Sequence, residues 1–137
     1  MKIPISWLNE LVTLPKERRV LTDALTSAGH MLDKVETVDG ETVIDLELRG
    51  NRADCYSLIG IAREVSAIFG TKVKYPPAIA LTKVAKLKNL SPRVATPLVK
   101  RVGMVEIRNV KITKSPDWLI KKLAIYGIAS VNNIVDL

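Results

Sequence analysis

At 137 residues, with 47% hydrophobic and 26% charged side chains, the chain has the composition of one soluble domain, or of one small domain and part of another. No apolar stretch approaches the roughly 20 residues that a membrane-spanning helix needs, and no signal-peptide-like run follows the first residues, so we expect no membrane association. The single cysteine, Cys55, excludes an internal disulfide. A reducing, cytoplasmic location is therefore expected.

The net charge of +7 is unevenly distributed. Residues 1–71 carry 8 basic and 11 acidic side chains, whereas residues 72–137 carry 13 basic and 3 acidic ones. This basic half would attract a polyanion such as RNA. Its most basic stretch, residues 83–114, has no aromatic residue to stack on bases, so weak, salt-sensitive phosphate contacts are expected. The candidate phosphate contacts are Lys83, Lys86, Lys88, Arg93, Lys100, Arg101, Arg108, Lys111 and Lys114. A solvated face, or a surface that meets an acidic partner subunit, would explain the same charges.

Two helices are predicted at the start of the chain. The first covers residues 6–13, where four apolar residues follow helical spacing: Trp7, Leu8, Leu11 and Val12. The second covers about residues 17–28 and ends at Gly29, because glycine adopts the left-handed conformation at a helix end without steric cost. Its apolar side consists of Val20, Leu21, Ala24, Leu25 and Ala28.

A β-hairpin and a third helix follow. Alternating residues on both sides of Asp39-Gly40 predict two paired strands, over about residues 31–38 and 41–48. The third helix is predicted from about Cys55 to Phe69, with Asp54 capping its first amides. Its buried stripe consists of Leu58, Ile61, Ala62, Val65, Ile68 and Phe69. We expect this stripe to pack against Trp7, Leu8, Leu21 and Leu25 as one core.

Four prolines interrupt residues 72–98, which are interpreted as a linker. A strand is predicted over about residues 102–112, and a helix opens at Ser115-Pro116-Asp117, where Ser115 would cap the first turn. The predicted fold class is α+β: a small helical, winged-helix-like domain with a hairpin in residues 1–71, then the linker. The incomplete start of a second α/β domain would occupy residues 99–137.

No catalytic, cofactor-binding or metal-binding residues are predicted. His30 and Cys55 are the only soft metal ligands, and they lie in separate predicted elements, so a zinc site is not expected. The glycines are scattered singly and match no phosphate-binding loop, which gives nucleotide binding no support. The acidic residues near Arg49 and Arg52 are interpreted as structural ion pairs. Trp7 and Trp118, each beside leucine in a first helical turn, are interpreted as core anchors.

Residues 51–70, NRADCYSLIGIAREVSAIFG, resemble a signature of bacterial phenylalanyl-tRNA synthetase β subunits. Two further segments resemble the family in the same order: SWLNELV near the start and SPDWLIKKLAIYGIASVNNIVDL at the end. The signature residues are Asn51, Arg52, Asp54, Cys55, Gly60, Arg63 and Glu64. The resemblance implies a structural, amino-terminal part of an enzyme that ligates phenylalanine to its tRNA. ATP and magnesium would serve that whole enzyme, a heterotetramer of two α and two β subunits, and this chain would contact tRNA weakly.

Departures from the family pattern limit what the resemblance implies. The inserted oligonucleotide-binding-fold domain of most relatives is replaced by the tight Asp39-Gly40 turn, which removes an accessory tRNA contact. Ala129 stands where the family has an editing-site arginine, and the chain ends before the editing histidine, so the editing-type domain is expected to be truncated. An alternative is a stand-alone winged-helix-like nucleic-acid-binding module.

Overall fold

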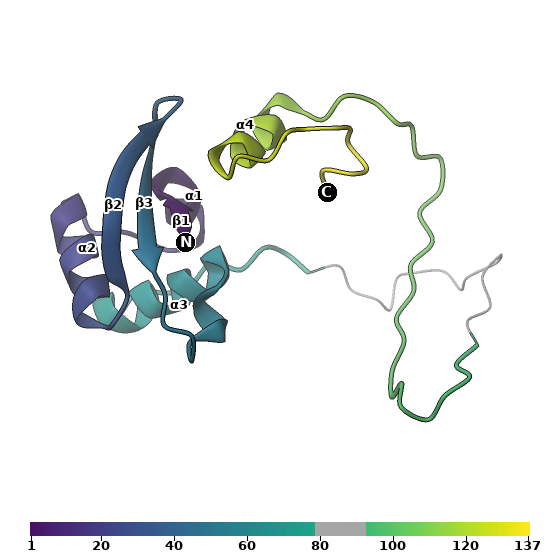
Figure 1. Ribbon diagram of the computed structural model, residues 1–137, viewed down its shortest axis with the longest axis horizontal. Coiled ribbons are helices and arrows are strands. Elements are labelled where there is room, and N and C mark those ends of the chain that lie inside the picture. The colour runs from purple at the N-terminus through teal and green to yellow at the C-terminus, as the bar shows by residue number, and fades with distance from the viewer. Residues whose placement is uncertain (79–92) are drawn as a thin grey trace.

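The computed structural model of the protein describes residues 1–78 and 93–137 (Figure 1). These residues form a small α+β structure with a three-stranded antiparallel sheet and four α-helices among the part described. In chain order the elements are β1 (Lys2–Pro4), α1 (Ile5–Leu11), α2 (Arg18–Ser27), β2 (Met31–Val38), β3 (Glu41–Glu47), the short 3-10 helix η1 (Ala53–Cys55), α3 (Leu58–Phe69) and α4 (Asp117–Ile125).

The predicted hairpin is confirmed as β2 and β3, which pair from Met31↔Glu47 to Val38↔Glu41. At its turn Asp39 and Gly40 both have positive φ, 49° and 80°, which is the backbone that a two-residue hairpin turn requires. The sheet order is β1-β3-β2, so β3 lies in the centre. Strand β1 was not predicted, because its three residues are too few to show a period.

Helices α1 and α2 contact strands β3 and β2, and α3 packs against α1 and α2, so that Figure 1 shows the three helices gathered beside the strands. The helical part of the predicted core is confirmed for Leu8, Leu21 and Leu25, and for the α3 stripe with Leu58 and Phe69 partly buried. The fully assembled cluster is Ile3, Leu8, Leu11, Val12, Leu21, Leu25, Ile44, Leu46, Cys55, Ile61, Ala62 and Val65. Burial of this apolar surface is the main stabilising contribution to the fold.

Three residues of the apolar stripes predicted for α2 and α3 are exposed. Val20 on α2 is 44% exposed and Ile68 on α3 is 36% exposed, because each lies beside rather than within the apolar stripe of its helix. Ala28 is also exposed, at the end of α2. The apolar stripe of each helix is therefore narrower than the sequence pattern predicts.

Trp7 is not an anchor of this core but a contact between α1 and α4. The Trp7 ring centroid lies 6.2 Å from the Tyr126 ring centroid in an edge-on arrangement. Lys122 Nζ lies 4.3 Å from the Trp7 ring centroid. Lys122 also pairs with Glu10 of α1, at 3.2 Å. Trp118 is 58% exposed, so its prediction as a core anchor is wrong as well.

The opposite face of the sheet is partly covered. Pro4 of β1 and Val43 of β3 are paired across the two strands, so their side chains point to the same face of the sheet. Both residues are buried. Near the hairpin turn, Val38, Asp39 and Glu41 line a cavity of about 240 Å³ together with Lys121 and Ile125 of α4. Helix α4 therefore lies against the hairpin as well as against α1.

The strand predicted over residues 102–112 is wrong, since the described residues there have no strand pairing and their side chains are mostly exposed. The alternation of apolar and polar residues is present, but a strand needs a neighbour to satisfy its backbone groups. The cap predicted at Ser115 is also wrong. Helix α4 follows Pro116 without a side-chain cap, and the Ser115 hydroxyl instead donates to Asp136 Oδ2 at 2.5 Å.

Candidate functional site

The signature segment begins with a 3-10 turn, η1, and continues into α3 after a break at Tyr56 and Ser57. Asp54 does not cap α3, contrary to the sequence-based prediction. Ser57 is the cap: its backbone is extended, and its hydroxyl accepts from the Gly60 amide at 3.1 Å. Asp54 is consequently available for an ion pair with a neighbouring side chain.

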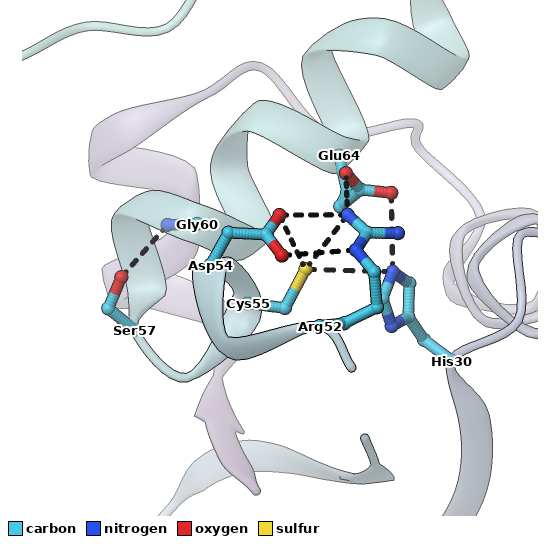
Figure 2. Close-up of polar contacts among 7 residues, drawn as sticks. All are labelled: His30, Arg52, Asp54, Cys55, Ser57, Gly60 and Glu64. Carbon is cyan, nitrogen blue, oxygen red and sulfur yellow. Dashed lines mark hydrogen bonds and ion pairs between the residues drawn. The ribbon is translucent and has the colours of Figure 1, made fainter. Parts of the chain in front are cut away.

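Arg52 is the centre of a polar cluster that joins this turn to α3 (Figure 2). Its Nε donates to Asp54 Oδ1 at 3.1 Å and its Nη2 to Asp54 Oδ2 at 2.9 Å, a bidentate pair. The same Nη2 lies 2.6 Å from Glu64 Oε1 and 3.2 Å from Cys55 Sγ. One guanidinium therefore holds acceptors from the turn and from the second turn of the helix.

His30 completes the cluster from a third element. It follows the left-handed Gly29 at the end of α2, and its backbone amide donates to the Leu25 carbonyl, which fixes the ring beside α3. The side chain is 1% exposed. Nε2 lies 3.2 Å from Glu64 Oε2 and 3.8 Å from Cys55 Sγ, whereas Nδ1 is buried without a hydrogen-bond partner.

The electrostatics of the cluster favour ion pairs over acid-base chemistry. Hydrogen bonds from Arg52 lower the pKa of the Asp54 carboxyl and the pKa of the Glu64 carboxyl below their ordinary values. In both cases this hydrogen bond is the largest cause. The Asp54 and Glu64 hydrogen bonds raise the pKa of the Arg52 guanidinium. Burial, with a smaller effect of the Asp54 hydrogen bond, raises the pKa of the Cys55 thiol to about 11. The carboxylates are thus ionised and covered by a cation, and the thiol is protonated at neutral pH.

The other signature residues have different surroundings. Gly60 is buried where α3 crosses the Asp54 backbone, and Arg63 is exposed, with its Nε donating to the Tyr75 hydroxyl at 3.3 Å. Asn51 is exposed in the preceding turn. The structure therefore brings Arg52, Asp54, Cys55 and Glu64 together, and leaves Asn51 and Arg63 at the surface.

Sequence reasoning did not predict that His30 joins this cluster, because 34 residues separate it from Glu64. The histidine was correctly interpreted as a residue that follows a helix end. The only local signal was that His30 directly follows Gly29 at the end of α2. That position does not indicate which side chains of another element will contact the histidine. Its neighbours depend on how α2 packs against α3.

The candidate phosphate contacts are placed only in part. Lys83, Lys86 and Lys88 lie outside the described residues. The remaining six, from Arg93 to Lys114, are all exposed on the segment that precedes α4. Among them Arg108 pairs with Glu106 at 2.7 Å and Lys114 with Asp117 at 3.6 Å.

The fold and the cluster define a class first: a small α+β unit whose polar centre has the geometry of a structural ion-pair network. Comparison with known proteins gives the particular relatives. The phenylalanine–tRNA ligase β subunit of Rhodopirellula baltica is 36% identical over 143 aligned positions, covering 100% of this chain and 20% of the relative. The β subunit of Clostridium tetani is 34% identical, covering 98% of this chain and 16% of the relative. That of Fusobacterium nucleatum is 42% identical over 71% of this chain.

The chain belongs to the family of phenylalanine–tRNA ligase β subunits, and it matches their amino-terminal region. It spans about one fifth or less of the length of these relatives. No protein-family model and no solved structure matches the chain. Within the described residues, no helix is long and apolar enough to cross a membrane.

Proposed function

We propose that this chain acts as the amino-terminal, structural part of a phenylalanine–tRNA ligase β subunit. The observation that carries the proposal is the alignment with the Rhodopirellula baltica relative, which includes both the folded unit of residues 1–78 and the segment that ends in α4. In this role the chain supports the ligation of phenylalanine to its tRNA at the expense of ATP, with magnesium. The α subunit, in a heterotetramer of two α and two β chains, supplies the synthetic site, and the cytoplasm is the compartment.

The exposed apolar side chains of the second half support a role as part of a larger assembly. Leu98, Val105, Ile107 and Ile112 are 85%, 66%, 77% and 73% exposed, and the accumulation of such large apolar side chains on one segment favours an interaction site. Apolar residues also remain exposed after α4, such as Val131 at 66%. We propose that the rest of the β chain covers them, and that residues 99–137 begin its editing-type domain after a linker at residues 72–98.

A chimera tests the proposal. The matching region of the Rhodopirellula baltica β subunit would be replaced by residues 1–137, and the chimera co-expressed with that organism's α subunit. We expect an assembled complex that charges tRNA with phenylalanine. A chimera that folds but neither assembles nor charges tRNA would contradict the proposal.

Two variants of the chimera locate the covered surface. Ile107→Asp places a charge at a position that the complex is proposed to bury, so it should lower the yield of assembled complex. Asn109→Asp is the matched control: it adds the same charge two residues away, at a position with φ of 57°, which Asn and Asp both tolerate. Equal yields from both variants would show that residues near Ile107 stay exposed.

Contact with tRNA is proposed to be weak and through phosphates. The supporting observation is that Arg93, Lys100, Arg101 and Lys111 are exposed on a segment without aromatic residues among residues 93–114. In an anisotropy titration of this chain with tRNA, Lys111→Gln should reduce the slope of log affinity against log salt by roughly one, whereas Lys16→Gln should leave it unchanged. Salt-insensitive or sequence-specific binding would favour the alternative, a stand-alone winged-helix-like nucleic-acid-binding module.

A further inference from the structure

Three side chains around Arg52 could together hold a metal ion. His30, Cys55 and Glu64 each direct one ligand atom to a common space, and within the described residues these atoms lie within 4.8 Å of one another. They come from the end of α2, from η1 and from α3, so packing of the fold rather than a flexible loop holds them together. His30 and Cys55 are almost completely buried.

The donor atoms suit zinc, and so do the two spacings that involve His30 Nε2, while the spacing of Cys55 and Glu64 is within 4.8 Å. Nitrogen, sulfur and oxygen ligands are those that Zn²⁺ accepts, and bonds of about 2.0–2.3 Å in a tetrahedron place ligand atoms roughly 3.3–3.8 Å apart. The His30 Nε2 to Glu64 Oε2 distance is 3.2 Å, and the His30 Nε2 to Cys55 Sγ distance is 3.8 Å.

Arg52 contacts two of the three residues that a metal ion would bind, at Glu64 Oε1 and at Cys55 Sγ. Its Nη2 donates to Glu64, Asp54 and Cys55, and the side chain is 31% exposed, so it can leave the cluster toward solvent. The charges balance in such an exchange. The guanidinium and the proton of the Cys55 thiol together carry two positive charges, and one Zn²⁺ would replace both, with the thiol proton released to water.

We propose that His30, Cys55 and Glu64 form a zinc site that Arg52 closes with its guanidinium, and that this site binds Zn²⁺ when Arg52 is withdrawn or removed. The buried His30 Nδ1 lacks the hydrogen-bond acceptor that usually supports a zinc-bound histidine. Loss of such a partner weakens metal affinity about 10–100-fold, so the arginine competes effectively in the unmodified chain.

The proposal is tested by titrating the chain and its variants with Co²⁺, which reports thiolate coordination by a charge-transfer absorption band, and with Zn²⁺ in competition. Arg52→Gln, which removes the charge, should bind Zn²⁺ at least tenfold more tightly than the unmodified chain and show the cobalt–thiolate band. Arg49→Gln, which removes an exposed arginine three residues away, should behave as the unmodified chain. The double variant Arg52→Gln with Cys55→Ser should lose the band.

Two outcomes would overturn the proposal. One is a folded Arg52→Gln variant that binds Zn²⁺ no more tightly than the unmodified chain or than the double variant. The other concerns folding itself: if Arg52→Gln is unfolded without metal, added Zn²⁺ should restore its helical circular dichroism, because binding to the native state alone stabilises that state. Failure of Zn²⁺ to restore it would contradict the proposal as firmly.

Discussion

A Cβ atom on Gly60 would lie 1.9 Å from the backbone carbonyl oxygen of Asp54. Real Cβ atoms do not come so near to an oxygen, so the first turn of α3 can cross the turn containing Asp54 only if residue 60 has no side chain. The same crossing brings Arg52 to Glu64 at 2.6 Å. The close approach of these backbones is therefore a condition for the whole polar cluster.

Gly60→Ala is consequently expected to destabilise the chain by about 1–3 kcal/mol or more, as overpacking of a filled site does. The sign of the effect is informative, because without the clash alanine would stabilise a helix by about 1 kcal/mol over glycine. Gly50→Ala is the control, since nothing lies within 4 Å of a Cβ there. Chemical denaturation of the three proteins measures the difference, and a Gly60→Ala variant as stable as the unmodified chain would contradict the packing described.

Ile61 and Ile68 lie on the same helix with opposite environments, fully buried and 36% exposed. Ile61→Ala should lower the free energy of unfolding by about 2–5 kcal/mol, through lost apolar burial and the cavity left behind. Ile68→Ala removes the same atoms from a surface site and should cost less than about 1 kcal/mol. Thermal melts with equal losses for both variants would show that α3 does not present its Ile61 face to the core.

The parts of the fold that sequence predicted are those specified by local chemistry. The Asp39-Gly40 turn and the Gly29 stop need only the residues beside them, so the hairpin and α2 were predicted with nearly correct bounds. Two capping predictions failed because Asp54 and Ser57 are both suitable caps, and Ser115 had a more distant partner in Asp136. Which acceptor each group chooses depends on tertiary structure.

The candidate site and the placement of α4 were beyond local reasoning. The contact of Lys122 with Glu10 joins residues 112 apart, and the contact of His30 with Glu64 joins residues 34 apart. Neither pair leaves a trace in hydrophobic periodicity, since all four side chains are polar. The wrong strand over residues 102–112 has a similar origin, because alternation describes a strand's faces but not the neighbour it must pair with.

Asp136 Oδ2 accepts hydrogen bonds from the hydroxyls of Ser115, at 2.5 Å, and Ser130, at 2.6 Å. The bond from Ser115 ties the last residues to the segment before α4. The Ser115 hydrogen bond, followed by that of Ser130, holds the pKa of Asp136 below its ordinary value. A carboxylate with a lowered pKa stabilises the folded state above the ordinary aspartate pKa of about 3.9. This contribution is lost as the pH falls through the lower pKa of the folded chain.

The Val131 amide donates to Asp136 Oδ1 at 3.0 Å. We therefore expect its NMR chemical shift to stay constant until the pH falls below the ordinary aspartate pKa. Asp136→Asn should abolish this acid transition, and Ser115→Ala should move it to higher pH. A Val131 transition at the ordinary aspartate value would mean that the carboxylate is not held by these donors.

Lys122 connects α4 to α1 by two interactions at once. Its ammonium lies 4.3 Å from the Trp7 ring centroid and within 3.2 and 3.3 Å of the two Glu10 carboxylate oxygens. Each interaction alone is modest, about 0.5–1 kcal/mol for an exposed cation–π contact and about 0.2–1 kcal/mol for an exposed ion pair. Their combination at one side chain makes Lys122 the residue on which the placement of α4 should depend most.

Lys122→Met retains the aliphatic stem but removes the charge, so it should increase hydrogen exchange of the α4 amides and change the tryptophan fluorescence, with little effect on the melting temperature of residues 1–78. The neighbouring Lys121→Met is the control, because Lys121 is exposed and faces the hairpin cavity rather than Trp7. A double-mutant cycle with Glu10→Gln separates the ion pair from the aromatic contact. If both lysine variants exchange their α4 amides at the same rate, α4 is held by its apolar contacts near Ile125 and Tyr126 instead, and the charge of Lys122 is not what positions it.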